Sequence, residues 1–447
     1  MFEILERRSS ATSLLFYKEK IKMLNKFNLK DDVVSTKLEN GLNLFFSKLS
    51  VLPLVTVNLW VRVGSVNESK AINGISHFLE HILFKDTKHY PNNLISKEID
   101  DIGGYINAAT SLDYTHYYIT VISEDMEKAF QVLSDMAYNL QINKENFERE
   151  KGVIIEEIQR GNDSPGNILW ENLYKSFFKN HNYANPIIGN KKNIVNMKME
   201  QLQDYYEEYY HPENMFLAVC GDVEHSKVLN LATKYFDIKP ANNKKGKKQE
   251  DIKFLQKYET ELNTDLYKEK EMSSINQTYF VYAWTAPCID DKLFTASYAL
   301  SKILGDGISS RLHKVLKQNC GIVWSIAATL AEEKYASLFV IYGTCDFQNL
   351  DKIDAKIKDE IKNIEKNITS DDLEKIKKMV NFQYQADLET SSDITDLLGY
   401  YEIMGDWKYA YQIEDILNNE LKLADIFEAA NQIFSQKFVR QIVKPKK

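Results

Sequence analysis

Two histidines and a glutamate lie within one short stretch of the sequence, GISHFLEHILF (residues 74–84). Its apolar residues fit one face of a helix, and residues four apart on a helix project from nearly the same side. His77 and His81 can therefore bind the same tetrahedral metal ion. Glu80 would lie beside this pair, close enough to take a proton from a metal-bound water without binding the metal itself. The other interpretation is a plain helix with two partly buried histidines.

A catalytic zinc site needs a third protein ligand, and the predicted amphipathic helix at 147–161 carries several acidic residues. Glu150 and Glu157 are seven residues apart, which is two helical turns, so they share a face. Glu156 instead precedes Arg160 by four residues, the spacing of a solvent-exposed ion pair. We therefore predict Glu157 as the ligand and Glu150 as an acid that orients a histidine. The other interpretation is that all these acids face solvent.

The composition is that of a folded protein with more than one domain. The chain has 447 residues, of which 44% are hydrophobic and 27% charged, and this length favours two domains of about 200 residues each. The net charge of −8 argues against nucleic-acid binding. No apolar run reaches the roughly 20 residues of a membrane-spanning helix. The four cysteines lie far apart, so we expect free thiols in a reducing compartment, either the cytoplasm or, in a eukaryote, the matrix of a mitochondrion or related organelle.

The elements that must position these residues fall on either side of a basic, asparagine-rich stretch. We predict that stretch, 241–255, as a linker rather than a binding patch. It separates a zinc-binding domain at 33–240 from a second domain at 256–447, with an N-terminal extension at 1–32. Both parts contain strand-like alternating segments, such as LVTVNLWVRV and SLFVIYGT, as well as helical patterns. This arrangement favours an α+β fold over a doubly wound parallel sheet.

The histidine motif, followed by the acidic helix with its VIIEE stretch, resembles the pitrilysin family of inverted-motif zinc metallopeptidases. The resemblance is greatest to the mitochondrial and bacterial processing peptidases. The segments GGYINAATSLDYTHYY and YHPENMFLAVCGDV resemble this family as well. The resemblance implies two similar domains, each a mainly antiparallel sheet with helices packed on one face, forming half of a clamshell. It also implies one Zn²⁺ per chain, bound by His77, His81 and Glu157, with Glu80 as general base.

Substrate-binding residues are likewise implied by the resemblance. The YINAAT segment, Tyr105–Thr110, would be an edge strand to which an extended peptide adds, and Asn107 and Ala108 would leave its backbone accessible. Without the family, an inner strand of small residues is an equal interpretation. Processing peptidases that prefer arginine near the cut carry two acids after the glutamate ligand. The matching positions here are Asn167 and Glu171, so one acid is missing and a strict arginine preference is not expected.

The resemblance also bears on partners. The family places an arginine and, seven residues later, a tyrosine in the second domain, where this chain has Lys317 and Trp324. Two domains are half of the family's four-domain clamshell, so we expect a dimer. Either Lys317 and Trp324 serve in a homodimer, or a homologous subunit that lacks the zinc motif supplies the arginine and tyrosine; we favour the second. The other interpretation is a solvated lysine and a core tryptophan.

The predicted function is therefore a zinc-dependent endopeptidase that cleaves unfolded peptides or presequence-like segments in a closed chamber. In this prediction a zinc-bound water attacks the peptide bond while Glu80 takes its proton. The alternative is a non-catalytic scaffold or assembly subunit of the same fold, against which the complete set of zinc-site residues argues. A hydrolase of nonpeptide substrates has only the metal in its favour.

Overall fold

The structure is a computed structural model that describes residues 28–238 and 265–446. The predicted linker at 241–255 and most of the predicted N-terminal extension lie outside the described residues, and the domain boundaries remain a prediction. The described part begins with a short helix, α3 (Leu29–Asp32). No helix within the described ranges is long and apolar enough to cross a membrane.

The first half of the chain forms a six-stranded sheet in the order β1-β2-β6-β3-β5-β4. Neighbouring strands are antiparallel except β2 and β6, which run parallel. Strand β4, which is the YINAAT segment, lies at the edge of this sheet, as predicted. The strands are β1 (Val33–Lys37), β2 (Asn43–Lys48), β3 (Leu54–Val61), β4 (Tyr105–Thr110), β5 (Thr115–Ile122) and β6 (Met215–Gly221).

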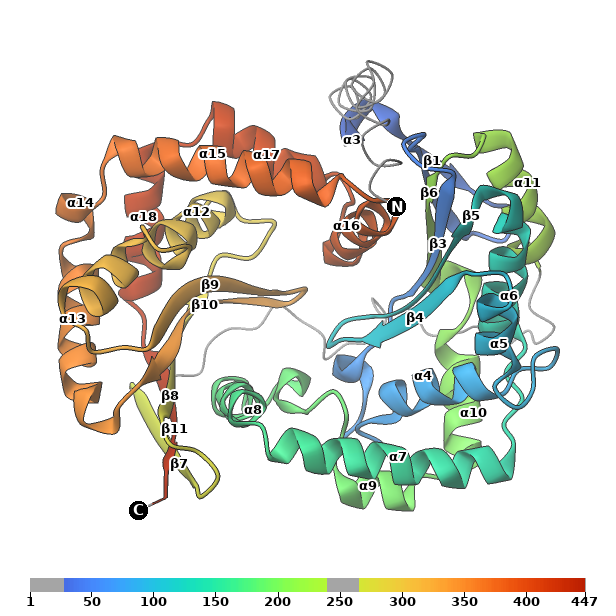
Figure 1. Cartoon of the computed structure of the whole chain (residues 1–447), viewed down its shortest axis with the longest axis horizontal. Helices are drawn as coiled ribbons and strands as arrows, with labels where there is room; N and C mark the ends of the chain where they lie inside the picture. Colours follow the sequence, from blue (N-terminus) through green and yellow to red (C-terminus); the bar gives the residue numbers. More distant parts are fainter. Residues whose placement is uncertain (1–27, 239–264, 447) are drawn as a thin grey trace, which may run out of the picture.

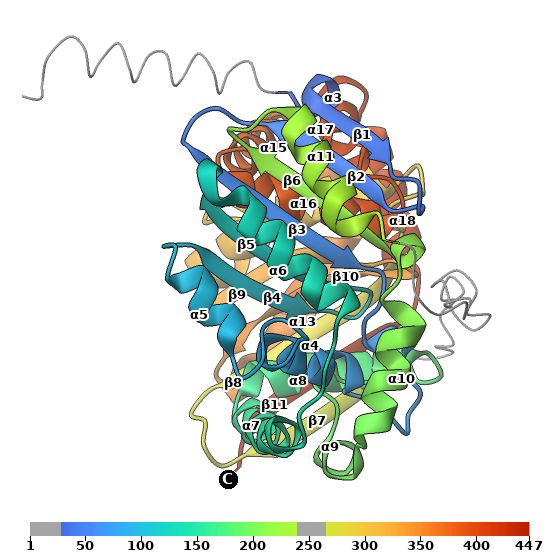
Figure 2. The same ribbon diagram turned by 90° about the vertical axis from the view of Figure 1, so that its right-hand side faces the viewer.

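Helices cover the outer face of this sheet, and Figure 2 shows α6 and α11 lying over its central strands. Alternate side chains of each strand point to the same face, so the apolar residues of β3 such as Val57 and Leu59 meet the apolar faces of these helices. Helix α7 runs beside α4 at one end of the sheet (Figure 1). The helices are α4 (Ile75–Lys85), α5 (Leu94–Asp100), α6 (Met126–Tyr138), α7 (Lys144–Asn162), α8 (Pro165–Phe177), α9 (Lys191–Asn196), α10 (Met199–Tyr209) and α11 (His225–Phe236).

The second half repeats this plan with a five-stranded sheet in the order β7-β11-β8-β10-β9. Here too one pair is parallel, β7 with β11, and the others are antiparallel. The strands are β7 (Leu266–Met272), β8 (Thr278–Ala286), β9 (Ser325–Glu333), β10 (Ala336–Cys345) and β11 (Phe438–Pro445). The main helices are α12 (Phe294–Gly305), α13 (Leu350–Lys362), α15 (Ser370–Asp387), α16 (Ser391–Met404), α17 (Tyr409–Asn419) and α18 (Leu423–Phe434). Both halves are therefore α+β with mainly antiparallel sheets, as predicted.

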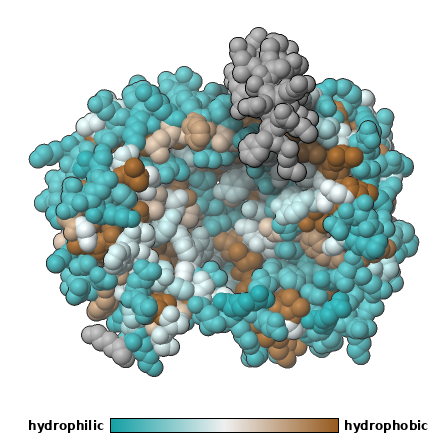
Figure 3. Space-filling model, viewed as in Figure 1, coloured by the Kyte–Doolittle hydropathy of each residue, from teal (hydrophilic) through white to brown (hydrophobic). Residues whose placement is uncertain are grey.

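Each half also sends one helix across to the inner face of the other half's sheet. Helix α16 packs on β3 and β6 of the first sheet, where Ile394 and Leu398 join a core cluster with Trp60. A side chain at Gly399 is excluded, because its Cβ would lie 2.0 Å from the Trp60 ring. Helix α8 packs in the same way on β8 and β11. This exchange holds the two halves together around a hollow that is visible in the space-filling view (Figure 3).

Candidate metal centre

Helix α4 carries the two histidines and Glu80. Its buried residues, which include Phe78, Leu79, Ile82 and Leu83, fix one face of the helix in the core. This leaves the histidines and Glu80 on the opposite side, as the helical spacing predicts. The helix begins at Ile75, two residues earlier than a cap at Ser76 would place its start.

Gly74 takes the capping position of α4, and Ser76 lies within the first turn. The Ser76 hydroxyl instead shares a hydrogen bond of 2.9 Å with the Tyr205 hydroxyl. Ser76 therefore does not cap the helix, although serine is a common capping residue.

Helix α7 supplies the predicted third ligand. The helix is held against α4 by Phe147, whose ring stacks on Phe78 with centroids 5.0 Å apart. The Glu157 Oε2 atom lies 3.8 Å from Nε2 of His77 and 3.7 Å from Nε2 of His81. One ligand atom from each of these three residues falls within 4.8 Å of the others. Glu156 is exposed.

These three residues fit a zinc ion. Zinc binds imidazole nitrogen and carboxylate oxygen at about 2.0–2.2 Å, so two ligands of one tetrahedral ion lie roughly 3.3–3.5 Å apart. The observed separations of 3.7 and 3.8 Å are close to that value. Burial, together with the nearby His81, lowers the pKa of His77 to about 3, so this imidazole is neutral and offers a lone pair.

Glu150 occupies the position behind His81 that the sequence predicts. Its Oε2 atom lies 3.2 Å from Nδ1 of His81, and its side chain is almost fully buried. Burial alone would raise the pKa of Glu150, but the hydrogen bond with His81 and the charges of Lys85 and Arg149 bring it below the ordinary value. The carboxylate therefore accepts a hydrogen bond from the protonated Nδ1 of His81. This leaves the lone pair of Nε2 directed at the candidate metal position.

Glu80 has a partner that the sequence reasoning missed. The Thr110 hydroxyl donates a hydrogen bond of 2.5 Å to Oε2 of Glu80. Burial raises the pKa of Glu80 above its ordinary value, although this hydrogen bond and the nearby His81 partly lower it. Strand alternation contained a signal for Thr110, because it shares with Ile106 and Ala108 the face of β4 that packs on α4.

The predicted peptide-binding strand has an exposed edge. The backbone N–H of Ala108 donates to the side-chain oxygen of its neighbour Asn107 at 2.9 Å. The Asn107 amide in turn donates to the Tyr105 hydroxyl at 3.1 Å. The short side chain of Asn107 thus occupies the edge of the strand beside the backbone N–H of Ala108.

The remaining predicted substrate residues do not join the metal group. Glu171 on α8 forms an ion pair of 2.9 Å with Lys175, the solvated i,i+4 arrangement. Lys317 is exposed within a π-helix, His313–Asn319. Trp324 is 61% exposed, so its interpretation as a core residue is wrong, and its indole N–H donates to Asp346 at 3.4 Å.

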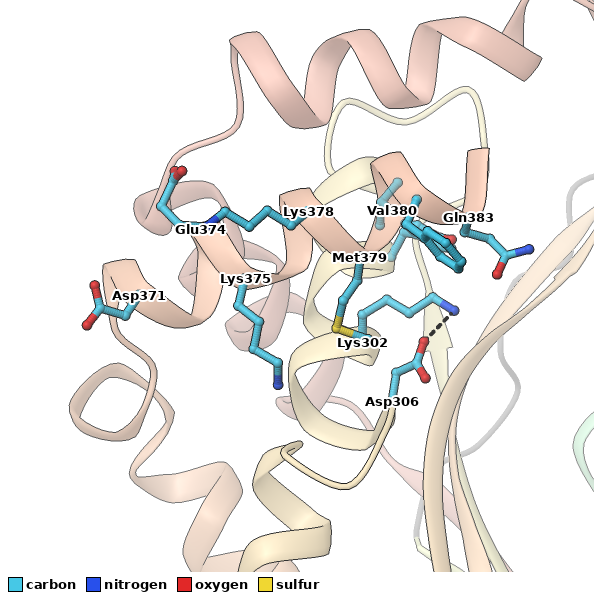
Figure 4. Close-up of a pocket in the computed structure, with 11 residues that line it drawn as sticks. Lys302, Asp306, Asp371, Glu374, Lys375, Lys378, Met379, Val380 and Gln383 are labelled. Carbon is cyan, nitrogen blue, oxygen red and sulfur yellow. Dashed lines mark ion pairs between the residues drawn. The ribbon is translucent and has the colours of Figure 1, made fainter. Parts of the chain in front are cut away.

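A cavity of about 660 Å³ lies elsewhere, between α12 and α15 (Figure 4). Lys302 and Asp306 form an ion pair of 3.0 Å inside it, and Met379 gives it an apolar wall. None of the residues that line it belongs to the metal group.

The thiols agree with the expectation of free cysteines. Cys220, Cys288 and Cys345 are buried and Cys320 is exposed, and no disulfide joins any two of them.

Comparisons with known proteins place this geometry in a family. Residues 48–191 match the sequence model of the insulinase family (Peptidase family M16), and residues 196–380 match that of the Peptidase M16 inactive domain. An uncharacterized zinc protease of Rickettsia bellii is 27% identical over 418 residues, which cover 93% of this chain and 98% of that protein. Cytochrome b-c1 complex subunit 1 of Bos taurus is 33% identical over 201 residues, 45% of this chain and 42% of that protein.

The solved structures agree with the sequence comparisons. A protease from Helicobacter pylori superimposes with a TM-score of 0.83 at 25% identity, covering 92% of this chain and 99% of that one. The relatives that match nearly the whole chain are named zinc proteases. This chain belongs to the M16 (insulinase) family of peptidases.

Proposed function

We propose that this protein is a zinc-dependent endopeptidase that cleaves unfolded peptides or presequence-like segments. The observation that carries the proposal is the convergence of His77, His81 and Glu157 from two helices, with Glu80 beside them. These three residues would hold one zinc ion per chain. Bound zinc would supply Lewis-acid chemistry, polarising the peptide carbonyl and lowering the pKa of a water molecule to about 7.

Glu80 is the general base in this proposal. Its carboxylate takes a proton from the attacking water and passes it to the amine nitrogen that leaves when the peptide bond breaks. Burial supports this role, since it raises the pKa of Glu80 and so makes the carboxylate a stronger base. Thr110 holds one carboxylate oxygen and so limits the rotation of the side chain.

The substrate would bind as an added strand on β4. The exposed edge of this strand, with the short side chains of Asn107 and Ala108, supports backbone hydrogen bonding to an extended peptide. A segment that adds to β4 must be extended and free of its own strand partners, which favours an unfolded substrate. Glu171 remains the candidate for contact with a basic substrate side chain, although it is paired with Lys175 in the structure.

A second chain would complete the chamber, because the described residues of this chain supply one candidate metal centre and two sheets. Lys317 and Trp324 are exposed and therefore accessible to a partner. Of the two dimers, we favour one with a homologous subunit that lacks the zinc motif. The relative in Bos taurus supports such assemblies, since it is named as a subunit of a larger complex.

That same relative also motivates a second candidate function, a non-catalytic assembly subunit. The chain matches the Peptidase M16 inactive domain over residues 196–380. A scaffold, however, has no need for a buried base beside three metal ligands, which is why we place the peptidase first.

The substitution Glu80→Gln separates these functions. We expect the variant to retain its zinc but to cleave unstructured peptides about 10²–10⁴-fold more slowly, the usual contribution of a general base. Glu156→Gln, on an exposed neighbour of the metal group, is the matched control and should cleave normally. A Glu80→Gln variant with the activity of the wild type would refute the proposal, and a wild-type chain that binds no zinc would favour the scaffold.

A further inference from the structure

The free backbone N–H groups at the N-terminus of α4 donate hydrogen bonds to a residue outside the helix. The first turn of any helix has peptide N–H groups that the helix itself cannot bond, and the capping residue, Gly74, has no side chain to offer. Glu68 takes this place. Its Oε2 accepts the backbone N–H of Gly74 at 2.7 Å, and its Oε1 accepts that of Ser76 at 2.9 Å. The side-chain amide of Asn73 adds a third donor at 2.8 Å.

The glycine at the capping position explains why the carboxylate is supplied by Glu68 and not by the capping residue itself. Gly74 has φ of +98°, and a Cβ at this position would lie 2.7 Å from the carbonyl oxygen of Ile188 and 2.9 Å from Cα of Gly189. A serine or aspartate, the usual capping residues, is therefore excluded at this position. The helix can be capped only from another segment.

The segment that holds Glu68 is itself fixed. The Asn182 amide donates to the carbonyl of Val66 at 2.7 Å and to that of Glu68 at 3.1 Å. The backbone N–H of Val66 donates to the carbonyl of Leu112 at 2.9 Å. Leu112 follows shortly after Thr110, the partner of Glu80, so the same β4–β5 connection supports both Glu68 and the candidate base.

Glu68 has no countercharge in the described parts of the chain. It is fully buried, and no lysine or arginine there forms an ion pair with it. A negative charge is favourable near the N-terminus of a helix because of the helix dipole. Burial raises the pKa of Glu68 from 4.5 to about 7, and the N–H donors of Gly74, Ser76 and Asn73 partly counter that rise by favouring the charged form.

We infer that Glu68 is a positioning residue that sets the place and rotation of α4, and with it the angle at which His77 and His81 meet the metal. The inference rests on the proposed function. His77 directly follows Ser76, whose N–H the carboxylate holds, so a shift of the first turn moves this ligand first. Glu68 touches neither the metal ligands nor the substrate strand and acts only through the helix.

The test is Glu68→Gln, which keeps the size of the side chain but replaces one acceptor oxygen by a donor. We measure the zinc dissociation constant by chelator competition and the visible spectrum of the Co²⁺-loaded protein, which reports ligand geometry. We expect the zinc dissociation constant to rise about 10-fold or more, as for other residues that orient ligands, together with a changed cobalt spectrum. Glu360→Gln, which removes a buried acid that pairs with Arg311 in the second half, is the matched control. It should change neither quantity.

A second variant covers the case in which Glu68→Gln does not fold. Glu68→Asp keeps the carboxyl group but shortens its reach, so it should accept only one of the two backbone N–H groups and give an intermediate dissociation constant. Wild-type zinc affinity and an unchanged cobalt spectrum in a folded Glu68 variant would overturn the inference, even with a lowered Tm. A wild-type chain that binds no zinc would instead overturn the proposed function.

Discussion

The carboxylate of Glu150 lies 3.2 Å from Nδ1 of His81, while Glu157 lies 3.7 Å from Nε2 of the same ring. The two nitrogens of one imidazole thus face two different acids from a single helix, α7. The buried acid favours the proton on Nδ1, and the half-exposed acid lies on the other side of the ring, within the group of residues that could hold a metal ion. The seven-residue spacing on α7 therefore produces two different roles.

Removing the buried acid should weaken the metal site without abolishing it. In Glu150→Gln the neutral amide replaces the charged acceptor of the hydrogen bond from Nδ1 of His81. The zinc dissociation constant should therefore rise about 10–100-fold. Chelator competition measures this change. Glu148→Gln, two residues earlier and on an exposed acid that pairs with Lys151 at 3.3 Å, is the control and should leave the constant unchanged. If both substitutions raise the zinc dissociation constant equally, the weaker binding results from the lost negative charge and not from the contact of Glu150 with His81.

Removing the predicted ligand should have a larger effect. Glu157→Gln should raise the zinc dissociation constant by more than about 100-fold, beyond the range expected for residues behind the ligands. The adjacent Glu156→Gln makes the same change of charge one residue away on an exposed face. If the two variants bind zinc equally well, Glu157 is not a ligand.

Thr110 should affect the base rather than the metal. Its hydrogen bond lowers the pKa of Glu80, so Thr110→Val should raise that pKa further. A base must be deprotonated to act, and the acidic limb of kcat/KM against pH should therefore move to higher pH, with a greater loss of activity at pH 6 than at pH 8. Zinc content should stay the same. Thr120→Val, which removes a hydroxyl bonded to Thr56, should leave the profile in place.

A buried acid between the two halves should make the stability depend on pH. Asp113 accepts the Tyr183 hydroxyl at 2.7 Å and the backbone N–H of Lys334 at 3.0 Å, and it lies against Glu333. Burial raises its pKa from 3.8 to about 6. A raised folded-state pKa stabilises the fold at low pH, and this contribution is lost as the pH rises through that window.

Thermal melts of the wild type and of Asp113→Asn measure this contribution. The free energy of unfolding of the wild type, relative to the variant, should fall by on the order of 1–3 kcal/mol between pH 4 and pH 7. In the background of Glu333→Gln, the difference in unfolding free energy between the chain with Asp113 and its Asp113→Asn variant should depend less on pH. The reason is that the two buried acids affect each other: burial and the neighbouring Asp113 raise the pKa of Glu333 as well. A constant difference between wild type and Asp113→Asn across this range would contradict the assignment.

The preferred heterodimer predicts weak activity of the chain alone. Mixing with a homologous subunit that carries the arginine and tyrosine should increase peptide cleavage, since one well-placed donor to the oxyanion contributes about 10²–10³ in rate. The double substitution Lys317→Arg with Trp324→Tyr should give part of that gain in the single chain, at unchanged zinc content. Full activity of the unmixed wild type, with no gain from either change, would point to a homodimer.

The local part of the site followed from sequence because helical spacing is a short-range property. The pairs His77 with His81 and Glu150 with Glu157 each lie on one helix, and their faces are fixed by four- and seven-residue periods. That these two helices meet was implied by the family resemblance and not by spacing. The edge position of the YINAAT strand was implied in the same way.

The contacts that support the site could not be predicted, because each joins segments distant in sequence. Strand alternation indicates the face of β4 on which Thr110 lies, but nothing near Glu80 indicates that Thr110 will reach it. Nothing near Gly74 indicates that Ile188 will exclude a capping side chain. Ser76 has the residue type of a cap, but the tight approach at Gly74 shifts the start of the helix. The exchange of α8 and α16 between the halves likewise depends on tertiary packing alone.

Peptide cleavage before and after metal removal tests the central claim most directly. The protein, together with its partner chain if one is required, is incubated with an unstructured peptide, then treated with a chelator and titrated with zinc. We predict that the chelator abolishes cleavage and that one molar equivalent of zinc per chain restores it. Cleavage that persists without metal, or that zinc fails to restore in a chain that remains folded, would contradict the account.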